Sequence, residues 1–145
     1  MDTMQRAGGI AALVASATYV FAIALVATVM KPMADVDLAF EQHMAFVSAH
    51  QALIFVWHAS MYFVNGACLV ILVLALDERL RDGSPRLARI ASAFGLIWAV
   101  FVFLSGLIVN SGTSALLRLS GRDQAQAEAL KHALDTITAG IDASD

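Results

Sequence analysis

Charge is the scarcest feature of this chain of 145 residues. Only 14% of the residues are charged, whereas 59% are hydrophobic. Soluble domains carry about 25% charged residues, so this chain has too little polar surface for a water-soluble fold. Cysteine is nearly absent too, and a single cysteine, Cys68, excludes an intramolecular disulfide. The net charge of −3 comes without any basic tract, so no nucleic-acid partner is predicted.

Long uncharged stretches are what the sequence does contain, and they cover residues 7–30, 51–76 and 90–117. A hydrocarbon core about 30 Å thick needs roughly 20 apolar residues of helix, so each stretch is long enough to cross a lipid bilayer. The sequence therefore predicts an all-α integral membrane helical bundle, built as a single membrane domain over residues 1–145. The predicted transmembrane helices cover residues 8–30, 51–76 and 89–111.

The first stretch is expected to remain as a span and not to be cleaved as a signal peptide. Its apolar run exceeds 20 residues, whereas the apolar region of a signal peptide covers roughly 7–15. The segment Ala24–Ala27 is also a poor cleavage motif.

Positive charge is unevenly distributed between the loops. The connection 77–89 carries four arginines, whereas the connection before the second span carries only Lys31, with three acidic residues nearby: Asp35, Asp37 and Glu41. Positively charged short loops stay in the cytoplasm. We therefore expect the N terminus and loop 77–89 to be cytoplasmic and the C terminus to lie outside.

Two segments outside the spans have a helical pattern. Phe40, Met44 and Val47 recur at spacings of four and three, which predicts an outer interfacial helix over about 37–49, with Asp35 or Asp37 as its N-cap. The third span is expected to end after Ser111–Gly112, and Gly121 makes a further break. An amphipathic C-terminal helix is then predicted over about 123–140.

The apolar residues of this C-terminal helix form one seam, with the charged residues elsewhere. The seam consists of Ala127, Leu130, Leu134, Ile137 and Ile141. It is too short for a coiled coil, which needs three to four heptads. Two interpretations remain open: the helix lies on the membrane surface or on its own bundle, or the seam contacts a partner chain.

Small residues recur every four positions in two of the spans. Helices in lipid approach closely where side chains are small, because lipid provides no hydrophobic force between them. These rows are predicted to mark the bundle interior or an oligomer interface. They consist of Gly8, Ala12 and Ser16 in the first span and Ala91, Gly95 and Ala99 in the third. Trp98 lies too centrally for an interfacial aromatic belt and is expected to pack inside.

Asn65 and His58 are the polar residues of the second span that need an explanation. An amide or an imidazole inside a membrane is costly unless it is paired. Each therefore either forms an interhelical hydrogen bond or contacts a ligand or ion. We expect His58 to be neutral and bonded to backbone or a serine. Asn110 is placed at the outer end of the third span, where water or headgroups satisfy it.

The sequence contains no recognisable catalytic or cofactor constellation. No span carries a carboxylate, and Ser60 cannot face His58 because residues two apart on a helix point in different directions. Bis-histidine haem needs ligands on two facing helices, but the other two spans lack histidine. We therefore predict no cofactor and no metal, and catalysis is not favoured.

Three functions remain open at this stage. The leading hypothesis is a non-catalytic packing or assembly subunit of a homo-oligomer or a larger membrane complex. The alternative is a membrane protein that binds or transports a small molecule or ion through Asn65 and His58. A membrane redox subunit is the third.

Three stretches of the sequence together resemble a group of uncharacterised bacterial multi-span membrane proteins. They are Asp77–Pro85, Ala93–Ala99 and Gly121–Ala127. The resemblance implies a multi-pass protein of the bacterial cytoplasmic (inner) membrane, and it implies no catalytic residues. Members of that group continue into further spans, so the resemblance also implies a shortened relative or a fragment.

Overall fold

Three long apolar helices dominate the fold, as the uncharged stretches predict. The computed structural model describes residues 3–34 and 38–142, and within them every regular element is helical. The first long helix is α1 (Thr3–Thr28). The second is a continuous rod made of α4 (Gln51–His58), the π-helix η1 (Ala59–Val64) and α5 (Asn65–Leu80), and the third is α6 (Pro85–Ser120). All three are long and apolar enough to cross a membrane, which confirms the predicted all-α fold.

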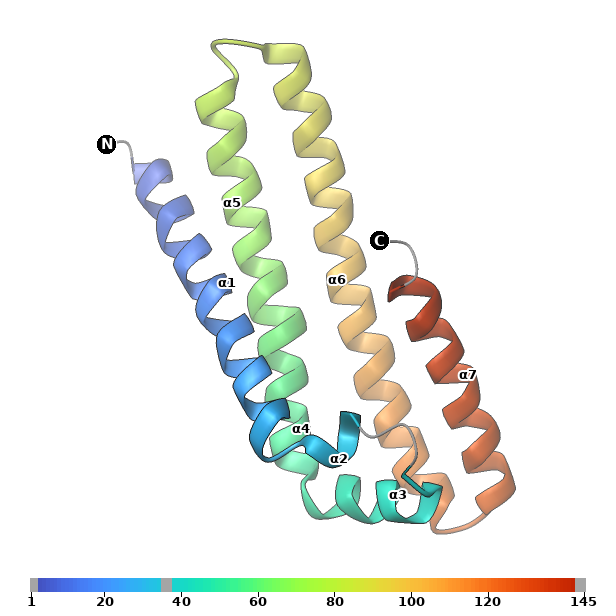
Figure 1. The fold of residues 1–145 in the computed structure, drawn as a ribbon. Coiled ribbons are helices and arrows are strands. Elements are labelled where there is room, and N and C mark those ends of the chain that lie inside the picture. The colour runs from blue at the N-terminus through green and yellow to red at the C-terminus, as the bar shows by residue number, and fades with distance from the viewer. Residues whose placement is uncertain (1–2, 35–37, 143–145) are drawn as a thin grey trace.

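The helix α5 lies between α1 and α6 and packs along both of them (Figure 1). Glycines allow these close approaches. A methyl group added to Gly8 would lie 2.5 Å from Cβ of Ala75, and one added to Gly95 would lie 2.6 Å from Cγ2 of Val73. Both distances are well below a normal carbon–carbon contact of about 3.5–4.0 Å, so the helices approach closely at these glycines.

The predicted rows of small residues lie only partly inside the bundle. Gly8 and Ala99 are buried and Gly95 is half-buried, but Ser16 and Ala91 are exposed. Four residues turn an α-helix by about 400°, so a strict four-residue row leaves the contact line after two steps. The residues of α1 that face the bundle instead follow one another at alternating steps of three and four. They are Gly8, Ala11, Ala15, Thr18 and Ala22.

A short helix closes one end of the bundle. The helix α3 (Phe40–Ala49) runs across the ends of the long helices, and α2 (Lys31–Ala34) precedes it (Figure 1). The buried side chains of Met30, Val47 and Ile54 form a small core here. The structure thus contains the expected short helix before the second span, beginning at Phe40. The proposed N-caps, Asp35 and Asp37, lie outside the described residues.

The third span continues beyond its predicted end. We expected a helix end after Ser111–Gly112, but α6 continues to Ser120. The final helix α7 (Gln124–Asp142) packs against this extension, and a methyl group on Gly112 would lie 2.7 Å from Leu134. Gly112 is therefore a contact point for α7. The chain turns at Gly121 instead, and Asp123 accepts a hydrogen bond from the backbone N–H of Gln126 (3.1 Å), which caps α7.

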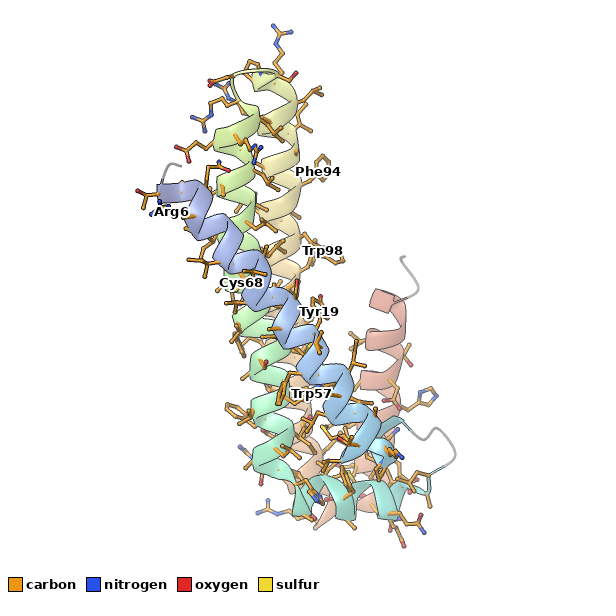
Figure 2. The ribbon with its side chains drawn as sticks, turned by 60° about the vertical axis from the view of Figure 1, so that its left-hand side comes forward. Arg6, Tyr19, Trp57, Cys68, Phe94 and Trp98 are labelled. Atoms are coloured by element: carbon orange, nitrogen blue, oxygen red, sulfur yellow. The ribbon has the colours of Figure 1, made fainter. Side chains whose placement is uncertain are left out.

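Many of the large apolar side chains point away from the bundle, as lipid contact requires. Phe94 and Trp98 project outward from α6 (Figure 2). Trp98 is 55% exposed, so the expectation that it packs inside is wrong. Its position on α6 is one before the buried Ala99, which turns the indole about 100° from the contact line with α5.

Candidate functional site

A part-buried polar contact joins His58 to Asn110. His58 is the last residue of α4 and only 4% exposed, and its Nδ1 lies 3.2 Å from Oδ1 of Asn110 on α6. Because an amide oxygen only accepts hydrogen bonds, Nδ1–H is the donor, and Nε2 of the neutral ring remains an acceptor. We expected backbone or serine for His58, and solvent or headgroups for Asn110. Both residues instead use a side chain on a neighbouring helix.

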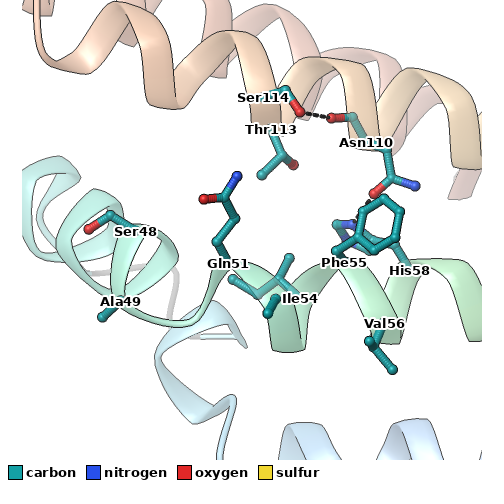
Figure 3. Close-up of a pocket in the computed structure, with 11 residues that line it drawn as sticks. Ser48, Ala49, Gln51, Ile54, Phe55, Val56, His58, Asn110, Thr113 and Ser114 are labelled. Carbon is teal, nitrogen blue, oxygen red and sulfur yellow. Dashed lines mark hydrogen bonds between the residues drawn. The ribbon is translucent and has the colours of Figure 1, made fainter.

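A cavity of 530 Å³ opens beside this pair, between α4 and the outer part of α6. Its wall combines apolar side chains, among them Phe55, with polar groups from both helices. Figure 3 shows the amide of Gln51 and the hydroxyl of Thr113 directed toward the same space. The hydroxyl of Ser114 donates to the carbonyl of Asn110 at 2.9 Å. The cavity therefore offers several hydrogen-bonding groups and no charged one.

A second cavity, of 490 Å³, lies on the other side of His58, toward α3 and α7. His58 and Thr113 line both cavities. The second one also contains charged groups, because Lys131 and Asp135 of α7 form an ion pair of 2.7 Å at its wall. His43 of α3 faces the same space.

The environment of His43 disfavours its protonated form. Partial burial lowers the pKa of His43 below its usual 6.5, and the nearby ammonium group of Lys131 lowers the pKa further. The carboxylate of Asp135 acts in the opposite direction but is the smallest of the three influences. His43 is thus held as a neutral hydrogen-bonding group at the mouth of the second cavity near pH 7.

Asn65 makes a different contact, on the other side of the rod. It is 7% exposed, and its Nδ2 donates to the hydroxyl of Thr18 on α1 at 2.8 Å. The Thr18 hydroxyl in turn donates to the carbonyl of Ala15 at 2.7 Å. This chain of hydrogen bonds ties α5 to α1, which agrees with the hypothesis of an interhelical bond.

The π-helix η1 explains why Asn65 and His58 do not share one site. Residues seven apart lie on nearly the same face of an α-helix, so the sequence places the two side chains together. A π-helical turn accommodates about one additional residue, which rotates the following segment by roughly 100°. The N–H of Asn65 bonds the carbonyl of Ser60, five residues earlier. His58 consequently faces α6, whereas Asn65 faces α1.

Asp77 is a buried polar residue that the sequence reasoning did not single out. Its side chain pairs with Arg81 one turn later and accepts a hydrogen bond from Ser92 of α6 at 3.0 Å. On the opposite side of α5, Gln5 donates to the carbonyl of Ala75 at 2.9 Å. The i,i+4 spacing of Asp77 and Arg81 in the sequence could have indicated this ion pair. These contacts fix the end of the bundle that carries the arginine-rich loop.

The seam of α7 begins against its own bundle. Ala127 is buried and Leu130 and Leu134 are half-buried, whereas Ile137 is 47% exposed. The side chain of Ile141 lies outside the described part of the chain. The first half of the seam therefore packs on the bundle of its own chain, which was the first of the two interpretations. A contact between the second half and a partner stays a prediction.

The arrangement around His58 is suited to holding a ligand by hydrogen bonds. It provides neutral donors and acceptors from three helices, next to apolar walls. Within residues 3–34 and 38–142, no group of three potential metal-binding side chains is close enough to hold an ion.

Comparison of the chain with protein families, with curated proteins and with solved structures gives no match.

Proposed function

We propose that this protein is a non-catalytic membrane subunit that assembles with a second membrane chain, either another copy or a larger partner. The observation that supports this is the position of α7. It runs back along α6 toward the middle of the bundle (Figure 1), with its apolar seam on α6 and its charged residues elsewhere.

The depth of α7 supports the proposal of a partner. Lys131 and Asp135 line one cavity together with Val109, next to the predicted end of the third span at residue 111. Beyond them α7 continues as helix to Asp142. A helix with one polar face at this depth would place polar groups against hydrocarbon, where a charged side chain costs up to about 3 kcal/mol at the bilayer centre and less toward its edge. A second protein surface over that face removes this cost.

The outward-facing small residues give a second reason. Ser16 and Ala91 continue the two small-residue rows but point away from the bundle. Close helix approach in lipid depends on small side chains, so these positions are suited to contact with a helix of another chain.

We place the subunit in the bacterial cytoplasmic membrane, with the N terminus and loop 77–89 inside the cell. The arginines that support this orientation, Arg79, Arg81, Arg86 and Arg89, are all exposed at one end of the bundle. The bacterial membrane itself is an expectation that comes from the resemblance of the sequence.

Cysteine crosslinking in native membranes tests the assembly. Cys68 is buried and is first replaced by serine. His132, exposed on the polar face of α7, is then changed to cysteine, and Leu107, exposed on α6 about 160° around the helix from Ala91, gives the matched control. We expect a short bifunctional crosslinker to join H132C to a second chain, which gives either twice the 15.4 kDa monomer mass or a heterologous product. A monomer at His132, or equal products at both positions, would contradict the proposal.

The cavity beside His58 favours a second candidate function, the binding of a small polar molecule. The buried His58–Asn110 bond at the wall of the 530 Å³ cavity supports it. Native mass spectrometry of the protein released in mild detergent separates the two functions. A stoichiometric non-lipid mass that His58→Ala abolishes would favour binding, whereas an oligomer carrying only lipid favours assembly.

A further inference from the structure

Two arginines at the outer end of α6 have no partner of opposite charge among the residues that the structure describes. Arg118 lies in the last turn of the helix and Arg122 follows its end, and both are exposed. Within the described part of the chain neither guanidinium group takes part in a hydrogen bond or an ion pair. The two side chains carry like charges, and an anion bound between them would offset their repulsion.

These arginines form one wall of a hollow of 660 Å³. Ser111, Ser114 and Asn110 supply its other polar groups, and no acidic residue lines it. The hollow therefore combines two guanidinium groups with hydroxyl and amide groups. This set of donors is suited to a phosphate, because a guanidinium group binds phosphate oxygens in pairs.

The hollow is continuous with an apolar surface. Asn110 and Ser114 line both this hollow and the 530 Å³ cavity beside His58. Phe55 and Val56, whose side chains are exposed, also line that cavity. Along this path the lining changes from cationic to neutral polar and then to apolar. A glycerophospholipid has the same order of groups, from phosphate through glycerol esters to acyl chain.

The depth of the arginines agrees with the position of lipid phosphates. Arg118 is seven residues beyond the predicted end of the third span, which corresponds to roughly 10 Å of helix. The headgroup layer extends about 5–8 Å beyond the hydrocarbon on each side. Long arginine side chains reach back toward this layer with their charged ends.

We propose that the hollow is a binding site for an anionic glycerophospholipid. Arg118 and Arg122 bind its phosphate, Ser114 and Asn110 bond the glycerol and ester oxygens, and an acyl chain lies along Phe55. Selectivity for an anionic lipid follows because the lining contains no carboxylate to receive the ammonium group of a zwitterionic headgroup. This site is independent of the proposed assembly through α7.

Lipid retention measured by native mass spectrometry tests the site. The protein is exchanged in mild detergent with equal amounts of dioleoylphosphatidylglycerol and dioleoylphosphatidylcholine. The variant R118Q/R122Q is compared with R86Q/R89Q, which removes the same charge from the other end of α6. Each arginine near a membrane surface changes affinity about fivefold, so we expect the first variant to retain phosphatidylglycerol roughly 30-fold more weakly. The control should behave as the wild type does.

Two further arms distinguish this site from nonspecific charge and from a free-anion site. R118K/R122K keeps both charges but loses the paired guanidinium bonds, so it should retain the preference for phosphatidylglycerol only in part. A helical circular dichroism spectrum equal to that of the wild type shows that R118Q/R122Q is folded. Equal loss in R86Q/R89Q, or unchanged retention in R118Q/R122Q, would overturn the proposal. So would displacement of the lipid by an equal concentration of inorganic phosphate, because that result would show a site for the free anion.

Discussion

Replacement of Gly106 by alanine tests the close packing between the second and third spans. Gly106 is buried on α6, and a methyl group there would lie 2.5 Å from Cβ and 3.0 Å from Cγ of Tyr62. Cβ of Tyr62 is fixed to the backbone and cannot rotate away. The two helices must therefore separate by about 1 Å to restore a normal carbon–carbon distance.

The expected magnitude follows from two opposing effects. Overpacking a close-packed site costs about 1–3 kcal/mol. Alanine is a better helix former than glycine by up to about 1 kcal/mol, which partly offsets this cost. We expect Gly106→Ala to lower the free energy of unfolding by about 1–2 kcal/mol. The π-helix η1 contains Tyr62, so the irregular segment itself has to move.

The assay is reversible unfolding in mixed micelles, followed by circular dichroism as sodium dodecyl sulfate is added. Gly9 provides the matched control, because a methyl group there would meet nothing within 4 Å. Gly9→Ala should leave stability unchanged or raise it slightly. If Gly106→Ala is as stable as Gly9→Ala, the close approach of α5 and η1 to α6 is not as described, and the packing argument fails.

Two further predictions concern polar groups. A double-mutant cycle of Asn65→Ala with Thr18→Val, in the same unfolding assay, should give a coupling of about 0.6 kcal/mol and no more than about 1.7, as for interhelical hydrogen bonds in lipid. A coupling near zero would contradict the bond. Because the pKa of His43 is lowered, the folded protein binds fewer protons than the unfolded chain. Its contribution to stability should be complete above about pH 6.5 and decline as the pH falls through the lowered pKa. The difference between wild type and His43→Gln, measured across this window, should show that slope, and parallel curves would refute it.

The spans could be predicted because one physical quantity determines them. The thickness of the hydrocarbon core requires about 20 uncharged residues, and the three stretches supply them. The end of α6 could not be predicted in this way. Glycine and serine at positions 111–112 indicate a break, but Leu134 packs on Gly112 and the helix continues. The hydroxyl groups of Thr113 and Ser114 bond to carbonyls one turn earlier, so they add no break.

The polar contacts were harder to predict because they join residues far apart in sequence. His58 and Asn110 are separated by 52 positions, and nothing local to either residue indicates the other. The hydroxyl group of Thr18 donates to the carbonyl of Ala15 in its own helix, a bond that any helical threonine can form. A hydroxyl group both donates and accepts, however, so the same Thr18 oxygen also accepts from Asn65.

The π-helix of the second span has a consequence for changes in chain length. Within η1 (Ala59–Val64), the backbone accommodates about one residue more than an α-helix of the same rise. A single-residue deletion there can therefore be absorbed by a return to regular α-helix, without a gap in the rod. His58 and Asn65 would then be six residues apart, and six α-helical steps turn by about 600°, which is the same relative angle that the π-helix gives over seven, so Asn65 could keep Thr18 while His58 keeps Asn110. The loss of one residue within η1 would therefore leave both ends of the span with their present neighbours, whereas the same loss in α4 or α5 would rotate one end by about 100° relative to the other.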